Sequence, residues 1–244
     1  MIVVPQRALA LTRKELYSQV NSPVFYGIAV FFLLFTSIWL FYFQQFFLRN
    51  TATLRPFFAA FPLAFVLVIP VITMKSWAEE RKMGSAELLL TMPFSEWDLT
   101  LGKFLSSLAM IAVLLVLTLP VPLSLLPLGD FDGGVIASEY LGAFLLGASA
   151  AALGHLLSAL SKNQAGAFLG SVVALLLVML MNQFTLGLNL PPLLAEAINA
   201  VSLAFHFESF SKGLIDTRDL AYFLLTTALF LYLNTRVLLF RKWR

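Results

Sequence analysis

The sequence contains no cysteine and few charged residues. Asp, Glu, Lys and Arg make up 12% of its 244 residues. Without thiols, the chain can form neither disulfides nor thiolate metal sites. Soluble domains carry roughly a quarter charged residues, so a chain that is 60% hydrophobic is predicted to be an integral membrane protein. The net charge of +3 is too small to indicate a nucleic-acid partner.

The patterns that mark common catalytic sites are also absent. A P-loop needs G-x-x-x-x-G-K-[ST] to hold phosphates, but the only Gly-Lys pair, Gly102-Lys103, precedes Phe104 and has Trp97 in place of the first glycine. Neither H-E-x-x-H nor G-x-S-x-G occurs. The chain is therefore predicted not to be an enzyme. Lys103 is expected to snorkel at the membrane surface.

The two histidines are isolated in the sequence. His155 is expected to hydrogen-bond between helices rather than to bind a metal. His206, with Glu208 and Asp216, leaves a weak outer metal site open, although a solvated loop is the favoured interpretation. We therefore predict no metal site and no cofactor bound by this chain.

Long apolar runs dominate the rest of the sequence. A helix that crosses a bilayer needs roughly 20 mostly apolar residues, and six segments qualify: 24–47, 57–74, 99–126, 140–160, 165–186 and 220–240. Pro120, Pro122 and Pro127 are expected to bend the third. We predict an all-α integral membrane protein with six transmembrane helices, in which residues 1–244 form a single domain.

If the six segments cross the membrane, Lys and Arg are unevenly distributed between its two sides. Basic residues favour the cytoplasmic side, so both termini are predicted to be cytoplasmic. Four then lie outside: Arg49, Arg55, Lys212 and Arg218. Twelve lie inside: Arg7, Arg13, Lys14, Lys75, Arg81, Lys82, Lys103, Lys162, Arg236, Arg241, Lys242 and Arg244.

The predicted spans contain almost no ionisable residues, which usually mark ion or proton paths. This disfavours a nucleotide-independent secondary transporter or channel. A membrane scaffold of an assembly complex is the other alternative. The fourth span is instead rich in small residues that let helices approach closely, and packing within one subunit explains them at least as well as a dimer contact. They are Gly142, Gly147, Ala148, Ser149, Ala150, Ala151, Ala152 and Gly154.

Two segments outside the spans have helical patterns. Residues 7–20 are predicted to form an amphipathic helix on the inner membrane surface, with Leu9, Leu16 and Val20 near one face. The charged residues Arg7, Lys14 and Glu15 lie elsewhere, and a simple charged anchor is the alternative. Residues 189–219 are predicted to form one or two short helices at the outer surface or partly re-entrant.

The sequence AEERKMGSAELLLTMPFSEWD, residues 78–98, is a polar stretch in an apolar chain. Residues 78–83 can extend the second span into water as a charged helix, and Gly84 is expected to end it. Ser95 to Asp98 has the form of a capping box that would start the third span.

A short helix is predicted between these two points. Ser85 is a good N-cap, Glu87 suits the first turn, and Pro93 forces a stop. Because the three leucines at 88–90 cannot all face one way, at least one is expected to be exposed. An exposed apolar residue among charges is typical of a docking surface, although a loop helix that only caps the bundle explains the residues equally well.

The stretch PVITMKSWAEERKMGSAELLLTMPFSEWDLTLGK resembles the signature of ABC-2 type transporter permeases. The matching residues are Pro70, Thr73, Met74, Glu79, Glu80, Arg81, Gly84, Ser85, Glu87, Leu88, Leu89, Leu90, Thr91, Pro93, Gly102 and Lys103. Ser85 stands where the family often has threonine. YLGAFLLGASAAALGHLLSALSKNQ and HFESFSKGLIDTRDLAYFLL resemble the gliding-motility-associated group, which is related to the permease of the nitrous-oxide-reductase maturation transporter.

The resemblance implies a multi-pass permease in the bacterial cytoplasmic (inner) membrane. It would dimerise with a second copy or a paralogue, and each copy would bind a separate cytoplasmic P-loop ATPase that holds ATP and Mg²⁺. Hydrolysis would drive substrate export or mechanical signalling across the lipid bilayer. A periplasmic or outer-facing auxiliary subunit is a further candidate partner.

The resemblance also assigns roles to residues. The short helix at about 85–92 would be the coupling helix, and residues 7–20 would be the interface helix, with Arg7, Arg13 and Lys14. The expected ATPase-coupling residues are Glu79, Glu80, Arg81, Gly84, Ser85, Glu87, Leu88, Leu89 and Pro93.

Overall fold

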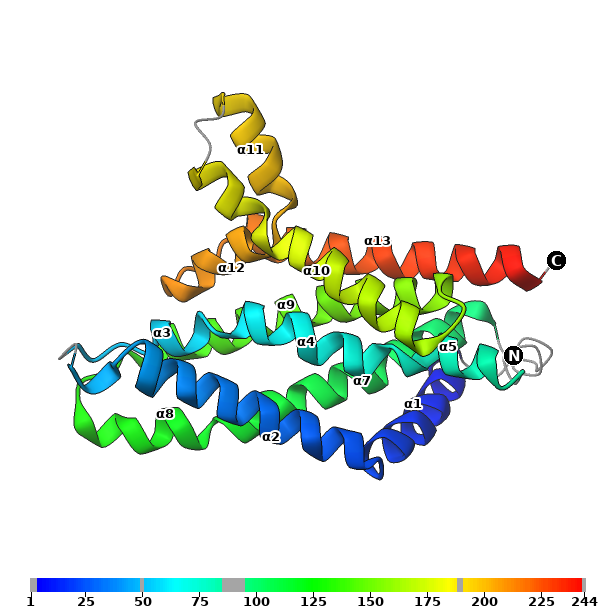
Figure 1. Cartoon of the computed structure of the whole chain (residues 1–244), viewed down its shortest axis with the longest axis horizontal. Coiled ribbons are helices and arrows are strands. Elements are labelled where there is room, and N and C mark those ends of the chain that lie inside the picture. Colours follow the sequence, from blue (N-terminus) through cyan, green and yellow to red (C-terminus); the bar gives the residue numbers. More distant parts are fainter. Residues whose placement is uncertain (1–3, 49–50, 85–94, 188–190, 243–244) are drawn as a thin grey trace.

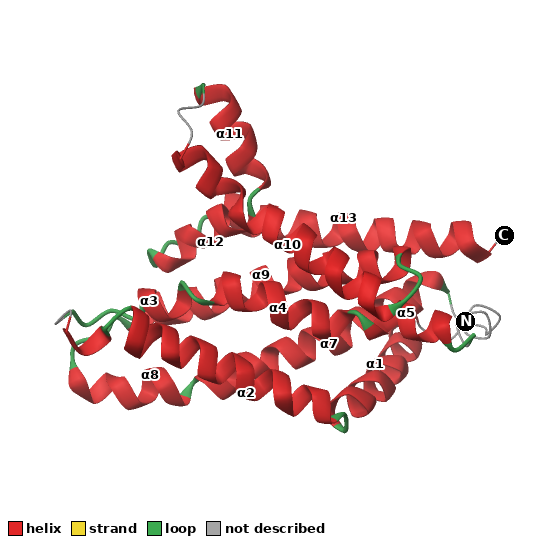
Figure 2. Ribbon diagram, in the orientation of Figure 1, coloured by secondary structure: helices red, strands yellow, loops and turns green. Residues whose placement is uncertain are grey.

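The computed structural model describes residues 4–48, 51–84, 95–187 and 191–242. Within those ranges all regular structure is helical (Figure 2). Six segments are long and apolar enough to cross a membrane: Pro23–Leu48, Arg55–Lys82, Glu96–Leu128, Gly133–Leu160, Gln164–Gln183 and Thr217–Phe240. The six predicted spans are therefore confirmed as candidate membrane-spanning helices.

Several of these spans are built from more than one helix. The elements are α1 (Val4–Val20), α2 (Pro23–Ile38), the π-helix η1 (Trp39–Phe43), the 3₁₀-helix η2 (Phe46–Leu48), α3 (Arg55–Phe58), α4 (Phe61–Thr73), α5 (Lys75–Lys82), α7 (Glu96–Thr118), α8 (Pro120–Leu125), the 3₁₀-helix η3 (Leu126–Leu128), α9 (Gly133–Leu160), α10 (Gln164–Gly187), α11 (Pro192–Val201), α12 (Leu203–Ser211) and α13 (Thr217–Lys242). The third span breaks between α7 and α8, where Pro120 begins the new helix, as its prolines predicted.

The helices form an elongated bundle with two distinct ends (Figure 1). The start of α1, the end of α5, the start of α7 and the end of α13 lie together at what we call the α5 end. The opposite α8 end holds α3, α8 and the end of α12. Helix α9 is central, because α4, α5, α7, α10, α12 and α13 all contact it.

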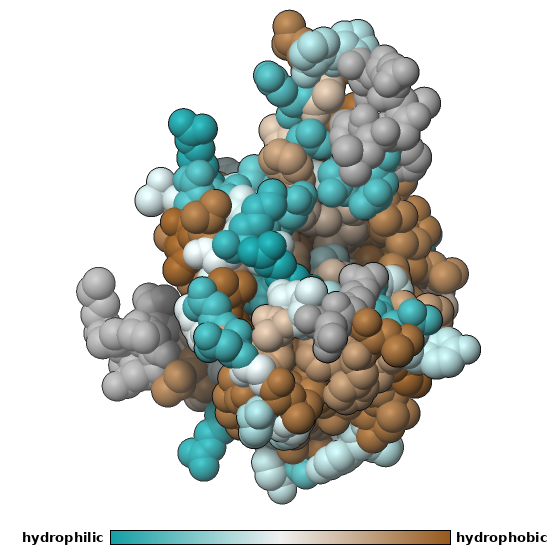
Figure 3. Space-filling model, turned by 90° about the vertical axis from the view of Figure 1, so that its left-hand side faces the viewer, coloured by the Kyte–Doolittle hydropathy of each residue, from teal (hydrophilic) through white to brown (hydrophobic). Residues whose placement is uncertain are grey.

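The surface of the bundle is largely apolar along its sides. Exposed side chains include Val30 on α2, Val116 on α7, Leu177 on α10 and Leu225 on α13. Figure 3 looks onto the α8 end, where hydrophilic and hydrophobic residues are intermixed. Apolar sides along the length of the bundle suit a protein that stands across a bilayer.

The small residues of α9 are buried inside this one chain. A Cβ atom added at Gly147 would lie 2.9 Å from Ile111 Cγ2, and one added at Gly154 would lie 3.0 Å from Thr73 Cβ. These glycines therefore let α7 and α4 approach the backbone of α9 closely. Packing within one subunit accounts for the small residues that the sequence placed in the fourth span.

The second span is interrupted after Met74 by a side chain from α9. The Ser158 hydroxyl donates to the Met74 carbonyl oxygen at 3.1 Å. The same hydroxyl accepts from the backbone N–H groups of Trp77 and Ala78, at 3.1 and 3.3 Å. A polar side chain inserted at the hydrogen-bond ladder is an established cause of a helix break, so Ser158 separates α4 from α5.

The helix predicted at residues 7–20 is observed as α1. Leu9 is 66% exposed, whereas Ala8 and Leu11 are buried. Leu16 and Val20 are only partly buried. The face that packs on α7 is therefore not the most apolar one, and the side chains described below show why.

The two short helices predicted within residues 189–219 are observed as α11 and α12. Helix α12 begins where the Ser202 side chain accepts from the Phe205 N–H, which is a typical N-cap. Helix α11 projects away from the rest of the bundle (Figure 1).

We expect Gly154→Ala to destabilise the protein, because its new Cβ would overlap Thr73, whose branched side chain is bonded to Ile69 O. Overpacking of this kind typically costs about 1–3 kcal/mol. Gly170→Ala is the matched control, since nothing lies within 4 Å of its Cβ position. Thermal unfolding in detergent should show a lower midpoint for Gly154→Ala alone. Equal midpoints would contradict the α4–α9 packing described here.

Candidate functional site

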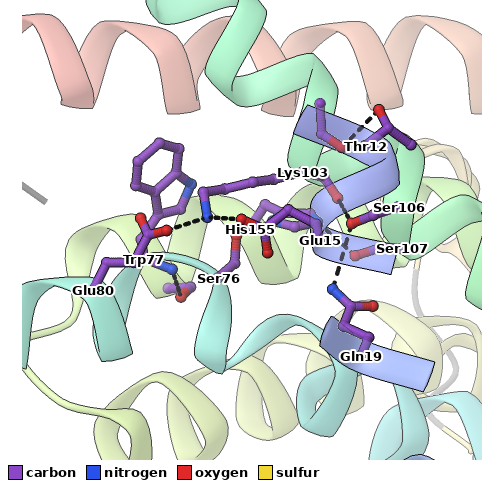
Figure 4. Close-up of polar contacts among 12 residues, drawn as sticks. Thr12, Glu15, Gln19, Ser76, Trp77, Glu80, Lys103, Ser106, Ser107 and His155 are labelled. Carbon is purple, nitrogen blue, oxygen red and sulfur yellow. Dashed lines mark hydrogen bonds and ion pairs between the residues drawn. The ribbon is translucent and has the colours of Figure 1, made fainter. Parts of the chain in front are cut away.

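Lys103 lies at the centre of a polar cluster between α1, α5 and α7 (Figure 4). Its ammonium group is 3.1 Å from Glu15 Oε1 on α1 and 2.7 Å from Glu80 Oε1 on α5. The Trp77 ring centroid lies 5.0 Å from the same nitrogen. We call these four residues, Glu15, Trp77, Glu80 and Lys103, the Lys103 cluster.

The expectation that Lys103 snorkels at the membrane surface is wrong. The residue is only 2% exposed, because α1 and α5 cover it. An ion taken out of water costs several kcal/mol unless it is paired and hydrogen-bonded. Lys103 meets that condition through two carboxylates on two different helices, so its burial depends on α1 and α5 being in place together.

The contact between α1 and α7 relies on a glycine. A Cβ atom added at Gly102 would lie 2.7 Å from Leu11 Cδ2 and 3.1 Å from Ala8 O. The Thr12 hydroxyl donates to Gly102 O at 3.1 Å, and the Gln19 amide donates to Ser106 Oγ at 3.4 Å. The polar residues of α1 thus select its packed face, and Gly102 allows the close approach.

His155 joins three helices by hydrogen bonds. Its Nδ1 lies 2.9 Å from Ser76 Oγ on α5, and its Nε2 lies 2.9 Å from Ser107 Oγ on α7. The predicted role of His155 between helices is confirmed. Among the described residues, no group of three or more His, Cys, Asp or Glu could hold a metal ion.

Arg81 ties the end of α5 to the end of α9. Its two terminal nitrogens donate to the carbonyl oxygens of Ala159 and Ser161. The last carbonyls of a helix have no partner within the helix and attract cations. Arg81 therefore supplies a cap for α9, while the neighbouring Glu80 faces Lys103.

Two other predicted coupling residues, Glu79 and Gly84, lie in the described ranges, just before residues 85–94. Glu79 is half-buried. Gly84 follows α5 with φ +72°, a conformation that glycine adopts most readily, so the predicted helix stop is confirmed. The Ser95–Asp98 capping box that starts α7 is also observed. Ser85, Glu87, Leu88, Leu89 and Pro93 lie outside the described residues.

The predicted interface-helix residues all fall within α1. Arg13 and Lys14 are exposed, and Arg7 falls within the described backbone only. Sequence reasoning missed Glu15 as the partner of Lys103. A signal was present, because Thr12, Glu15 and Gln19 recur at helical spacing and form a polar stripe that needs partners.

Two ionisable groups lie in surroundings that were not predicted from the sequence. Glu139 is fully buried in α9, and within the described structure neither carboxyl oxygen has a hydrogen-bond partner; it was overlooked because the predicted fourth span began at residue 140. His206 lies on α12 rather than in a solvated loop. Its Nδ1 is 2.6 Å from Asp219 Oδ1, and its ring stacks on Tyr222.

These contacts tie α5 to its neighbours at the α5 end, and we call this set of contacts the joint. Helix α5 is bound to α7 through the Glu80–Lys103 pair, and Lys103 also pairs with Glu15 on α1. Arg81 and the Ser158 hydroxyl bind α5 to α9. A displacement of α5 would therefore act on several spans at once.

We expect Lys103→Met to destabilise the protein, because it leaves Glu15 and Glu80 close together without their counter-ion. Breaking a buried pair in this way costs about 3–5 kcal/mol. The triple variant Lys103→Met/Glu15→Gln/Glu80→Gln, which removes the charges together, should recover most of the loss. Thermal unfolding midpoints would measure the loss in Lys103→Met and the recovery in the triple variant. Lys162→Met, at an exposed lysine, is the control. Equal midpoints for Lys103→Met and Lys162→Met would contradict the cluster's role.

Comparison with known proteins gives these features a context. Over 146 residues the chain is 25% identical to proteins described as "Probable multidrug ABC transporter permease YbhR" from Escherichia coli strain K12 and from Escherichia coli O157:H7. The alignment covers 59% of this chain and 39% of each relative, so the chain spans well under half the length of the relatives it matches. Residues 40–234, more than half of the chain, match the family described as ABC-2 family transporter protein. The chain therefore belongs to the ABC-2 transporter family.

Proposed function

We propose that this chain is the permease subunit of an ABC transporter and that it couples ATP hydrolysis by a separate ATPase to movement of its own spans. The observation that carries the proposal is the joint at the α5 end. Residues 85–94 connect α5 to α7, and both helices meet at the Lys103 cluster. Force applied to that connection would be passed to α1 through Glu15 and to α9 through Arg81.

The proposed sequence of events starts in the partner. ATP and Mg²⁺ bind to a cytoplasmic P-loop ATPase, since this sequence lacks the phosphate-binding loop. The connection at 85–94, with Ser85, Glu87, Leu88, Leu89 and Pro93, seats in that ATPase as a coupling helix. Glu79, Glu80, Arg81 and Gly84 link it to the bundle. Two permease copies, or this chain and a paralogue, then switch together between inward-open and outward-open states.

The α5 end is proposed to face the cytoplasm. Basic residues are favoured on that side, and exposed examples at this end are Arg13, Lys14, Lys82 and Lys162. Helix α1, with Arg7, Arg13 and Lys14, would then lie at the inner surface as the interface helix. In a bacterium this membrane is the cytoplasmic one.

Export of a small molecule is the favoured activity, because the matched relatives are described as probable multidrug permeases. The resemblance to the gliding-motility-associated group keeps mechanical signalling to an outer-facing auxiliary subunit as a second form of the proposal.

One observation favours the alternative of nucleotide-independent secondary transport. Glu139 is buried in a candidate span, and ionisable residues inside a span often mark ion paths. Transport in vesicles without nucleotide would favour that alternative, and stable partners without nucleotide-dependent motion would favour a scaffold.

The orientation can be tested with single cysteines, because the chain contains none. Lys82→Cys at the α5 end and Glu196→Cys on α11 both replace exposed residues. A membrane-impermeant maleimide should label Glu196→Cys in intact cells and Lys82→Cys only in inverted membrane vesicles. The reverse pattern would overturn the proposed orientation.

The coupling role can be tested by placing a charge on the proposed coupling helix. We expect Leu88→Asp to abolish co-purification of a P-loop ATPase, since a buried unpaired carboxylate is costly in an interface. Leu193→Asp, on the exposed surface of α11, is the matched control and should retain the ATPase. Peptide mass spectrometry of both preparations measures the outcome. If the Leu88→Asp variant still co-purified with the ATPase, the proposal that residues 85–94 are the docking site would be wrong.

A further inference from the structure

A partly open cavity of about 480 Å³ lies beside the Lys103 cluster, and α1, α2, α4, α5 and α7 line it. Its volume falls in the range of roughly 300–1,000 Å³ that is typical of small-molecule sites. Glu15, Glu80 and Lys103 contribute to its wall. These three side chains sum to one negative charge, and both carboxylates are held by Lys103, so the remaining lining residues offer the groups that a ligand can contact.

The inner part of the cavity is apolar. Its lining includes Phe25 and Ile28 on α2, Ile72 on α4 and Met110 on α7, all of which are buried. Val71 on α4 lies beside them and is partly buried. A space with these walls favours a hydrocarbon chain over water, because a stable water needs two to four polar partners.

The mouth of the cavity is polar and carries two lysines. Lys14 on α1 is exposed and Lys75 on α5 is half-buried. In the part of the chain that the structure describes, no salt bridge involves either lysine. Glu79 is the one lining carboxylate outside the Lys103 cluster, so Lys14, Lys75 and Glu79 together carry one positive charge at the mouth, and the cluster deeper in carries one negative charge.

A hydrogen-bond acceptor also remains for a ligand. The Gln19 side chain lines the cavity, and within the described structure its buried Oε1 has no hydrogen-bond partner. A buried amide oxygen without a partner costs about 1–3 kcal/mol. A hydroxyl group of a bound molecule could remove that cost.

The position of the cavity indicates that its ligand comes from the membrane. It lies where α1 ends and α2, the first candidate span, begins, and Val24 at the start of α2 is exposed beside it. This is the level at which lipid head groups meet acyl chains. We propose that the cavity binds an anionic phospholipid from the leaflet at the α5 end, with an acyl chain along Ile28 and Val71 and its phosphate between Lys14 and Lys75.

The test uses the purified full-length chain and native mass spectrometry with two added lipids of equal chain length, dioleoyl phosphatidylglycerol and dioleoyl phosphatidylcholine. The wild type should retain phosphatidylglycerol preferentially. Lys14→Ala/Lys75→Ala should weaken that retention about tenfold, because each lysine near the surface contributes to the attraction of anionic lipid. Val71→Phe, which fills the apolar part, should reduce retention of both lipids.

Two controls make the result decisive. Arg13→Ala/Lys162→Ala removes the same charge from exposed residues at the same end of the bundle that do not line the cavity, and it should retain phosphatidylglycerol within about twofold of the wild type. Thermal unfolding without added lipid should be alike for all variants. Three results would each overturn the proposal. The two double variants could lose phosphatidylglycerol equally, the wild type could retain the two lipids equally, or Val71→Phe could retain both lipids fully. The readout requires no ATPase, so its failure would leave the proposed coupling role intact.

Discussion

The requirement that a buried ammonium group be neutralised organises the α5 end of this protein. Lys103 lies on α7, yet both of its carboxylate partners come from elsewhere, Glu15 from α1 and Glu80 from α5. If one of the three helices were missing, at least one of these charges would lose its partner. The free-energy cost of an unpaired buried ion exceeds the energy of most single contacts. The three helices are therefore stabilised as one assembly, and moving any of them changes the electrostatic balance of the others.

The same region combines this electrostatic tie with a break in the backbone. Ser158 interrupts the helical ladder after Met74, so a short break separates α5 from α4. Arg81 and Glu80 then fix the direction of α5 against α9 and α7. A short helix that is bonded to its neighbours at both ends passes a displacement on to them. This geometry explains why charged residues cluster just before residues 85–94.

The spans and their borders were predictable from the sequence, but the packed faces were not. Apolar length located the six spans, and Gly84, Ser95 and Pro120 located helix ends through local backbone chemistry. The apolar face of α1 named from Leu9 did not reveal which face packs on α7, because lipid is as apolar as a protein interior and an apolar face therefore gains little from turning inward. Polar and small residues gain more, which is why Thr12, Glu15 and Gln19 face α7 at Gly102 and Ser106. Glu139 was overlooked for a simpler reason, since it lies one residue before the predicted span.

The lipid cavity and the joint share a wall, and this has a consequence for motion. Lys14 is next to Glu15 on α1, and Lys75 begins the α5 helix that carries Glu80. A phosphate held by both lysines would bridge the two helices that Lys103 already joins from the other side. Displacing α5 would then have to stretch two charge-assisted contacts rather than one, each of them stronger than a neutral hydrogen bond. The composition of the membrane would thereby set the resistance of the joint.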